Sequence, residues 1–304
     1  MITITGSDEI MVESFTAGTV NNGDNWLERD GYIPEYKKDL NRLAYVLTLR
    51  SKISQIDQFD KNISSAFGFL NTAESALDQV QTVMHSIVSL AEQGASDTVG
   101  PDERNTLADN IEAMRDEILN YANSEIMGKY IFAGSATDTQ PFTQGPDTWD
   151  AVNNIWIPGV VTYNGNSDDI DVQADFSVTV TTNIPGDEVF TGPNFDIFDR
   201  LSTLVQNLRN NDTVAIGNDI GNMSEILDQV SSAIGTIGNR TSHLHQVQGL
   251  LKSFRSSIQA RMSSLEDADM AEVISNLTRE EVGLQATLQT GARIQRYSLI
   301  NYLE

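Results

Sequence analysis

The chain has 304 residues, which is enough to bury a core in one or two domains. It contains no cysteine, which excludes disulfide bonds, thiolate metal sites and cysteine nucleophiles. The net charge of −24 argues against binding to nucleic acid or to an anionic membrane, because both need clustered lysine and arginine. No apolar run is long enough to span a membrane, and residues 1–10 lack the basic and apolar regions of a cleavable signal peptide, so we expect any export to use another route.

The first 37 residues lack a helical period and are rich in Gly, Asn, Asp and Thr. Asn22-Gly23 and Asp30-Gly31 are turn signals, and Pro34 is a helix breaker. This composition predicts loops or short strands.

A heptad pattern begins near Leu40. Alternating steps of three and four give twelve positions, nine of them apolar: Ile53, Ile56, Asp60, Ile63, Phe67, Leu70, Glu74, Leu77, Gln81, Met84, Val88 and Ala91. The pattern predicts a long coiled-coil helix that ends at Gly94. Pro101, followed by Asp102 and Glu103, predicts the start of a second helix.

The period changes between Tyr130 and Phe190. Asn164-Gly165 separates residues 160–163 from residues 170–172, which predicts a hairpin between these two segments. Phe176, Val178 and Val180 alternate with small polar residues, as expected of a strand. We therefore expect a small β-rich insertion between helical arms.

A second long heptad pattern follows a short helix expected over residues 195–208. Eleven of its fourteen positions are apolar: Ile220, Met223, Leu227, Val230, Ile234, Ile237, Thr241, Leu244, Gln248, Leu251, Arg255, Ile258, Met262 and Leu265. A helix of this length spans roughly 70 Å, close to that of the first long helix, so the two can pair antiparallel. The predicted fold is mainly α: an elongated antiparallel coiled-coil rod plus a small β domain, with Ile63, Leu77, Leu227 and Ile234 among the residues that hold the helices together.

The last forty residues form an amphipathic stretch that we expect to be separate from the second long helix. An apolar helix face at a terminus is unfavourable in a monomer unless something covers it. Two interpretations remain open: the stretch folds back on the rod, or it is an assembly helix that neighbouring molecules order.

The sequence offers little for catalysis. His85, His243 and His245 lack the spacing that would let two of them share a metal on one helix face. We expect no enzyme, no cofactor and no metal, with a weak calcium site at Asp168, Asp169 and Asp171 as an alternative.

Four segments carry a family resemblance. They are Gly128–Gly134 with Thr137, Thr139, Pro141 and Phe142; Gly235–Leu244; Leu265–Glu272 with Leu284–Ala286; and Ser298–Leu303. Together they resemble the flagellar hook-associated protein 3 family, the flagellin-like proteins of the hook–filament junction, over about residues 43–304.

The resemblance implies a structural adapter that joins the hook to the flagellin filament outside the cell. It implies a homo-oligomeric ring, contacts with hook-associated protein 1 and with flagellin, and an export chaperone on the C-terminal helix. The family signature comprises Gly128, Tyr130, Ile131, Phe132, Gly134, Pro141 and Phe142, and the assembly helix carries Leu277, Leu284, Leu288, Leu299 and Leu303. From the residues alone, Tyr130 and Phe132 are core anchors where helix turns into sheet, with Gly128 and Gly134 allowing the bend.

The expected domains follow from the same segments. They are an atypical N-terminal segment (1–42), an N-terminal helical arm (43–138), a β-rich outer insertion (139–193), a C-terminal helical arm (194–265) and an inner-tube assembly helix (266–304). Residues 1–42 lack the family's N-terminal pattern, which suggests that this segment has been replaced. The alternatives to an adapter are a flagellin filament subunit and a binding module built on the acidic insertion.

Overall fold

The structure is a computed structural model that describes residues 32–151, 155–192 and 195–301. The chain divides into two compact units. The first unit consists of Met1–Lys52 and Ile258–Glu304, and the second consists of Ile53–Ser257.

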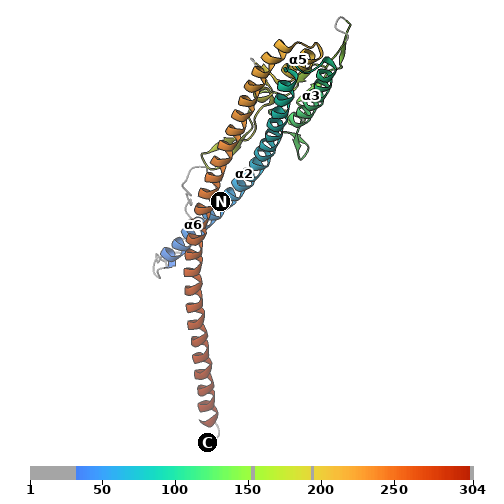
Figure 1. Cartoon of the computed structure of the whole chain (residues 1–304). Coiled ribbons are helices and arrows are strands. Elements are labelled where there is room, and N and C mark those ends of the chain that lie inside the picture. The colour runs from blue at the N-terminus through green and yellow to red at the C-terminus, as the bar shows by residue number, and fades with distance from the viewer. Residues whose placement is uncertain (1–31, 152–154, 193–194, 302–304) are drawn as a thin grey trace. The chain divides into compact units, whose positions relative to one another are not determined.

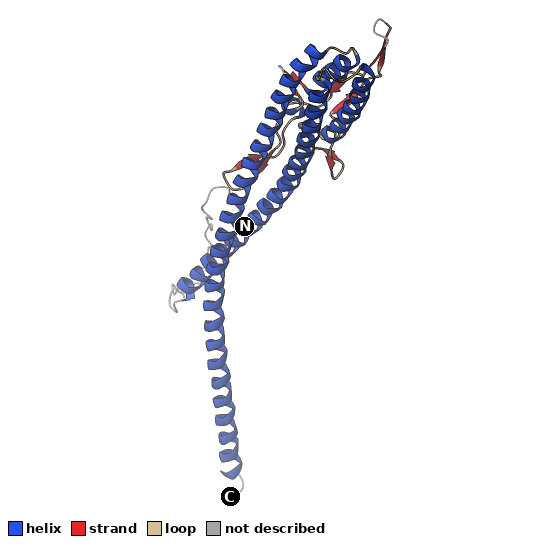
Figure 2. Cartoon of the chain, in the orientation of Figure 1, coloured by secondary structure: helices blue, strands red, loops and turns tan. Residues whose placement is uncertain are grey.

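Helices make up most of the described residues (Figure 1, Figure 2). In chain order they are α2 (Tyr32–Gly94), α3 (Pro101–Ala122), α4 (Gly186–Val189), α5 (Ile197–Arg209) and α6 (Thr213–Asn301). Short strands lie between α3 and α5, so the chain is mainly α with a β-containing insertion, as the sequence predicts.

Within the second unit, α2 and α6 run antiparallel. Arg255 Nη2 lies 2.9 Å from Asp57 Oδ1, and Gln81 Nε2 donates to Ser231 Oγ at 2.9 Å. From Asp57 to Gln81 the partner in α6 moves back from Arg255 to Ser231, which is 24 residues in each helix. The register is therefore kept over about 36 Å of helix, and the predicted pairing is confirmed here.

Half of the predicted heptad positions in α2 are correct. The buried apolar residues of its heptad are Ile56, Phe59, Ile63, Ala66, Leu70, Ala73, Leu77, Val80, Met84, Ile87 and Ala91. The predicted positions Asp60, Phe67, Glu74, Gln81 and Val88 are each one residue too late. From Ile56, steps of three and then four reach an apolar residue every time, whereas the predicted steps of four and then three reach Asp60, Glu74 and Gln81.

The same one-residue shift affects α6. Met223, Val230 and Ile237 are buried as predicted, but the positions between them are Ile226 and Ala233. The predicted Leu227 and Ile234 are only half-buried. Apolar residues are adjacent at 226–227 and at 233–234, so spacing alone does not decide which member of each pair is buried. The buried members, Ile226 and Ala233, are the ones that continue the interface of the helix pair.

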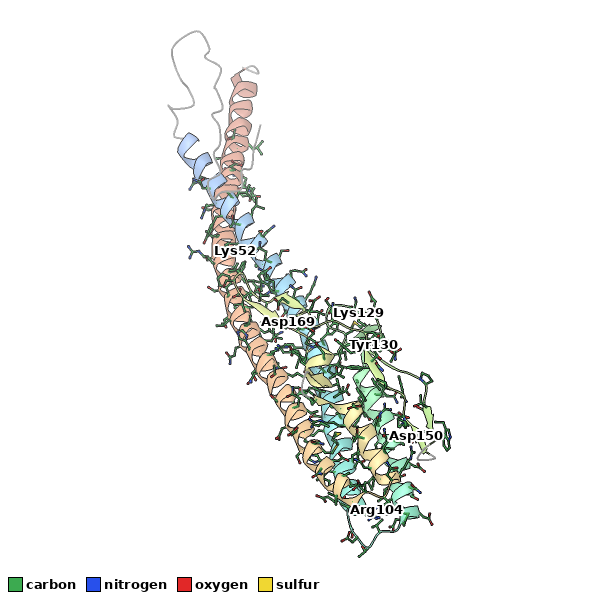
Figure 3. All side chains as sticks on the ribbon, turned by 90° about the horizontal axis from the view of Figure 1, so that it is seen from above. Lys52, Arg104, Lys129, Tyr130, Asp150 and Asp169 are labelled. Atoms are coloured by element: carbon green, nitrogen blue, oxygen red, sulfur yellow. The ribbon has the colours of Figure 1, made fainter. Side chains whose placement is uncertain are left out.

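The turn from α2 to α3 follows the sequence signals. Helix α2 ends at Gly94, and α3 has Gly100 as its N-cap and proline in its first turn. Arg104 Nε donates to Gly94 O at 2.7 Å, its Nη2 donates to Ser96 O at 2.7 Å, and its Nη1 donates to Asn211 Oδ1. Arg104 thereby satisfies one carbonyl at the end of α2 and one just after it, and it ties this turn to the turn between α5 and α6. Figure 3 shows Arg104 at the start of α3.

The strands form antiparallel pairs and no larger sheet within the described residues. The pairs are β1 (Glu125–Ile126) with β2 (Lys129–Tyr130), β3 (Phe142–Gln144) with β6 (Val161–Tyr163), β4 (Thr148–Asp150) with β5 (Ile155–Ile157), β7 (Asp171–Gln173) with β8 (Thr179–Thr181), and β9 (Thr191–Gly192) with β10 (Phe195–Asp196).

The hairpin predicted around Asn164-Gly165 is wrong. Strand β6 pairs with β3, and β7 pairs with β8. Asn164 N donates to Pro141 O at 2.7 Å, and its Nδ2 donates to Thr143 Oγ1 at 2.8 Å, so Asn164 extends the pairing with β3. Long-range contacts thus override the local turn signal.

Both ends of the described chain depart from the sequence expectations. Helix α2 already begins at Tyr32, so residues 32–37 are not a loop. Pro34 falls in the first helical turn. Proline is tolerated there because the backbone N–H that it lacks would have no acceptor within the helix. Residues 1–31 lie outside the described residues. Helix α6 continues without a break from Thr213 to Asn301, so the stretch after residue 265 is not a separate helix.

Candidate functional site: the terminal helices and the signature segment

The terminal part of α6 carries exposed apolar side chains. Ile274, Leu277, Val282 and Leu288 are 55–65% exposed. Leu277 and Leu288 are eleven residues apart, which is close to three helical turns and places them on one side of the helix. Leu284 and Leu299 belong to the same helix, whereas Leu303 lies outside the described residues.

The N-terminal part of α2 in the same unit is also exposed. Leu43 and Leu47, four residues apart and hence neighbours on the helix surface, are both more than half exposed. Within this unit, the guanidinium carbon of Arg261 lies 5.4 Å from the centre of the Tyr45 ring. This distance is typical of a cation–π interaction, which is a contact of modest strength between the two terminal segments.

The signature segment begins with a tight hairpin. Strands β1 and β2 are joined by Met127 and Gly128, whose φ angles are 52° and 75°. Two consecutive positive φ angles are the mark of a type I′ turn, in which glycine is favoured at the second position. Gly128 therefore forms the turn, and Lys129 and Tyr130 follow it in β2 (Figure 3).

Residues 131–134 lie in the protein interior. Ile131, Phe132 and Ala133 are at most 1% exposed, and Gly134 is buried with a φ of 65°. A Cβ atom at Gly134 would lie 2.0 Å from Asn166 O. Only glycine satisfies both the backbone angle and the available space, which explains its place in the signature.

The two phenylalanines of the signature belong to an aromatic cluster. The Phe142 ring centre lies 5.0 Å from Tyr163, 5.3 Å from Phe190 and 5.6 Å from Phe198. Phe132 meets Phe190 edge-on at 5.2 Å. These are favourable aromatic geometries, and the cluster fixes the insertion against α5.

Hydrogen bonds complete this junction. Tyr163 Oη donates to Phe132 O at 3.0 Å, and Gly186 N donates to the same oxygen at 2.8 Å. Burial raises the pKa of Tyr163 to about 12, with Asp187 adding to the effect. Pro141 is buried, and its carbonyl accepts the bond from Asn164. Most signature residues are therefore core, but Gly128 is exposed in its turn and Tyr130, expected as a core anchor, is only half-buried.

Arg115 is a core residue that the sequence pattern did not suggest. It lies in the apolar stripe of α3 and is 1% exposed. Its Nη2 donates to Gly159 O at 2.7 Å, its Nε donates to Phe198 O at 3.4 Å, and its Nη1 lies 3.6 Å from Asp116 Oδ1. Burial lowers the pKa of Arg115, while the nearby carboxylates, Asp116 above all, oppose that shift.

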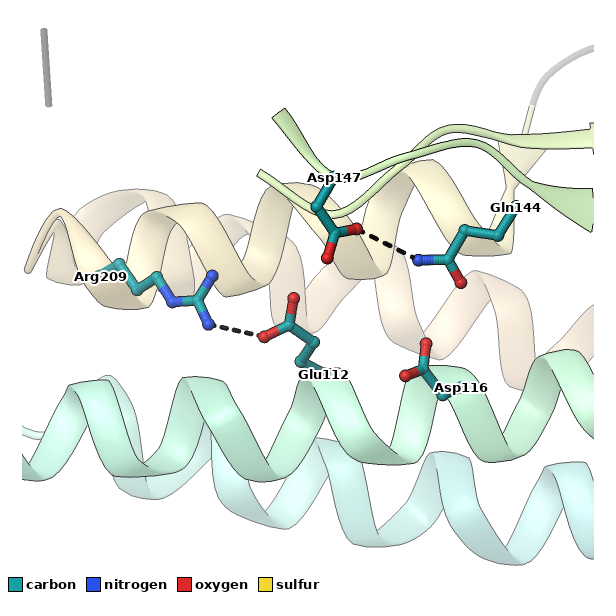
Figure 4. Close-up of a pocket in the computed structure, with 5 residues that line it drawn as sticks. All are labelled: Glu112, Asp116, Gln144, Asp147 and Arg209. Carbon is teal, nitrogen blue, oxygen red and sulfur yellow. Dashed lines mark hydrogen bonds and ion pairs between the residues drawn. The ribbon is translucent and has the colours of Figure 1, made fainter. Parts of the chain in front are cut away.

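A polar hollow lies between α3 and the segment that leads into β4 (Figure 4). It is lined by Glu112, Asp116, Gln144, Asp147 and Arg209. Arg209 Nη2 pairs with Asp109 at 2.9 Å and with Glu112 at 2.6 Å, so the one cation of the lining is held by carboxylates of α3 and the hollow as a whole is acidic. Burial raises the pKa of Asp116, and Arg115 partly offsets it.

The acidic turn considered as a calcium site has its carboxylates bound to neighbouring side chains. Asp168 accepts from Ser135 and Asn166, and Asp171 accepts from Thr181. Within the described residues, no cluster of His, Asp or Glu side chains could hold a metal ion, and no helix is long and apolar enough to cross a membrane. His85, His243 and His245 are exposed.

Comparison with known protein families matches two regions of the chain. Residues 37–137 match the bacterial flagellin N-terminal helical region, and residues 218–303 match the bacterial flagellin C-terminal helical region. The matched regions fall on α2 with α3 and on α6.

Two curated relatives align with nearly the whole chain. Flagellar hook-associated protein 3 of Salmonella typhimurium is 24% identical, over 96% of this chain and 98% of that protein. The protein of the same name from Escherichia coli is 23% identical over the same shares. By contrast, flagellin B of Helicobacter pylori aligns with 34% of this chain and 20% of its own length. Because 96% of the chain is aligned with hook-associated protein 3, the likeness reaches into residues 1–42 and is longer than residues 43–304.

Solved structures share the fold. The structure of a putative flagellar hook-associated protein from Vibrio parahaemolyticus has a TM-score of 0.63 at 20% identity, covering 73% of this chain and 96% of that one. Flagellar hook-associated protein 3 from Legionella pneumophila has a TM-score of 0.63 at 15% identity, covering 73% and 99%.

Proposed function

This chain belongs to the flagellin-like proteins and is a homologue of flagellar hook-associated protein 3, and we propose that it is a structural subunit of the bacterial flagellum that joins the hook to the flagellin filament. The observation that carries the proposal is the exposed apolar side of the terminal part of α6, with Leu277 and Leu288 on it. In a soluble subunit such a surface is unfavourable, and it suits a helix that neighbouring subunits cover.

The mechanism is helix docking, and no bond is made or broken. Burying each exposed leucine contributes roughly 1.5–3 kcal/mol. Several such residues in each subunit offset the entropy lost when the terminal helices are fixed in an assembly. We expect no catalytic activity, since the ion pairs of Arg209 and the buried residues of the signature, Phe132 and Phe142 among them, serve stability.

The proposed partners follow from the junction role. Copies of the chain form a ring, hook-associated protein 1 lies on the hook side, and flagellin lies on the filament side. An export chaperone covers the C-terminal helix before assembly. The protein works outside the cell, where its net charge of −24 keeps free subunits soluble.

The proposed division of labour keeps the domain boundaries expected from the sequence. Residues 43–138 and 194–265 form the arms of the helical domain, 139–193 the outer insertion, and 266–304 the inner-tube helix. Within the insertion and its flanks, the aromatic cluster around Phe142 supports a rigid attachment to α5. The origin of residues 1–42 stays a prediction that sequencing of the locus and of the purified protein tests.

A deletion strain separates the adapter from its alternative, a flagellin filament subunit. Cells lacking this chain are expected to build hooks and to release flagellin monomers into the medium, as seen by electron microscopy and immunoblotting. Long filaments on such cells would rule out the adapter role. Loss of the filament without release of another flagellin would favour the filament subunit.

A further inference from the structure

The hairpin formed by β7 and β8 reaches the paired helices through its turn. Ala174 N and Asp175 N both donate to Val178 O, at 2.9 and 3.2 Å, and Phe176 lies inside this turn. In Figure 3, Asp169 marks the chain just before the hairpin.

Phe176 contacts both long helices. Its ring meets Phe59 of α2 edge-on, with 5.1 Å between ring centres and an angle of 85°. It meets Phe254 of α6 in the same way, at 6.2 Å and 89°. A hydrogen bond of 2.9 Å from Asn62 Nδ2 to Gln173 O adds a second link between the hairpin and α2.

These contacts fall where the apolar interface between the helices is incomplete. Ile56 and Ile258 are buried there, but Ile53 is only half-buried, and Phe254 is 43% exposed although it occupies a heptad position after Leu251. Polar contacts also join the two helices here: Asp57 forms an ion pair with Arg255, and Gln248 donates a hydrogen bond to Asp60 at 2.9 Å. Exposed polar pairs stabilise little by themselves, so apolar contact from elsewhere matters most at this point.

The same position is the end of the compact unit. The unit runs from Ile53 to Ser257, so its two boundaries lie within about ten residues of Phe59 and Phe254. Helices α2 and α6 continue past both boundaries, and nothing in their own sequence terminates them there.

We propose that the β7–β8 hairpin is a clamp that holds α2 and α6 together at the end of this unit, with Phe176 as its wedge. Phe176 is 44% exposed, so it lies across the edge of the helix pair and adds apolar contact to Phe59 and Phe254 at this incomplete end of the interface. Without the wedge, the pair opens from this end while the rest of the interface stays closed. The proposal concerns the free subunit and does not depend on the flagellar role.

Amide hydrogen exchange on the full-length protein tests the clamp. Phe176→Ala is expected to speed exchange roughly 10- to 100-fold in segments 55–63 and 247–256, as the loss of two aromatic contacts predicts. Exchange in segment 70–91 is expected to stay as in the wild type. Phe176→Leu, which keeps an apolar wedge, is expected to restore most of the protection.

Val178→Ala is the matched control, because Val178 belongs to the same turn and its backbone oxygen keeps the two bonds from residues 174 and 175. It is expected to leave exchange in both helix segments unchanged. Unchanged exchange in Phe176→Ala would overturn the clamp. Faster exchange throughout the unit, including segment 70–91, would also overturn it, because the hairpin would then be part of the global core.

Discussion

Asn123 and Phe142 are joined by two hydrogen bonds. Asn123 Nδ2 donates to Phe142 O at 2.9 Å, and Phe142 N donates to Asn123 Oδ1 at 2.9 Å. Asn123 is the C-cap residue of α3, so one side chain ties the end of that helix to the last residue of the signature. The aromatic cluster around Phe142 is thereby placed directly after α3.

Replacing Asn123 by alanine is expected to destabilise the protein. Both backbone groups of Phe142 would lose their partner at a partly buried site, at a cost of about 1–3 kcal/mol. Urea unfolding followed by circular dichroism measures the change. Asn120→Ala is the control, since Asn120 is exposed near the end of the same helix, and an equal loss in both variants would contradict the role given to Asn123.

The two signature glycines are expected to differ in their tolerance of alanine. Gly128→Ala meets open space and costs only the positive φ angle, about 1 kcal/mol. Gly134→Ala meets the same angle and also places Cβ against Asn166 O, so it is expected to cost clearly more. The melting temperatures of the two variants, measured by thermal unfolding under the same conditions, test this difference. Equal melting temperatures would contradict the packing described for Gly134.

The corrected interface in α6 predicts unequal effects for two neighbours. Ile226→Ala empties a fully buried heptad position and is expected to cost about 2–5 kcal/mol. Leu227→Ala, at a half-buried position, is expected to cost about 1 kcal/mol or less. Chemical unfolding of both variants tests this, and the reverse order would restore the heptad assignment made from the sequence.

The sequence predicts what depends on repetition and misses what depends on distant contacts. Ile63, Leu70 and Leu77 recur every seven residues, so the paired helices were predictable. The choice between Leu227 and Ile226 was not, because either fits the spacing. The pairing of β6 depends on a segment some twenty residues earlier, and Arg115 stands in an apolar stripe without any local signal. Asn123 likewise acts through a residue nineteen positions away.

Burial of Asp219 predicts a pH dependence of stability. Burial raises the pKa of this carboxyl, and the bond of 2.7 Å from Asn207 Nδ2 opposes the shift. A folded-state pKa above the unfolded one means that the contribution of Asp219 to stability is complete at pH values below the ordinary aspartate range. It is lost as the pH rises through the folded pKa.

Asp219→Asn should therefore stabilise the protein at pH 7 relative to the wild type, since the amide oxygen still accepts from Asn207. The advantage should vanish at pH 3, where the wild-type carboxyl is protonated. Urea unfolding at both pH values gives the answer, and a variant that is less stable at pH 7 would show that the charged form is favoured.

The central claim is that the exposed side of α6 around Leu277 and Leu288 joins this subunit to its neighbours. Exposed substitutions of this kind usually change stability by less than about 0.5 kcal/mol, so Leu277→Glu/Leu288→Glu should unfold like the wild type. The decisive measurement is complementation of the deletion strain, scored by electron microscopy for filaments on hooks. The wild-type chain is expected to restore filaments and the double variant, exported at the same level, to leave bare hooks. Full-length filaments with the double variant would contradict the claim.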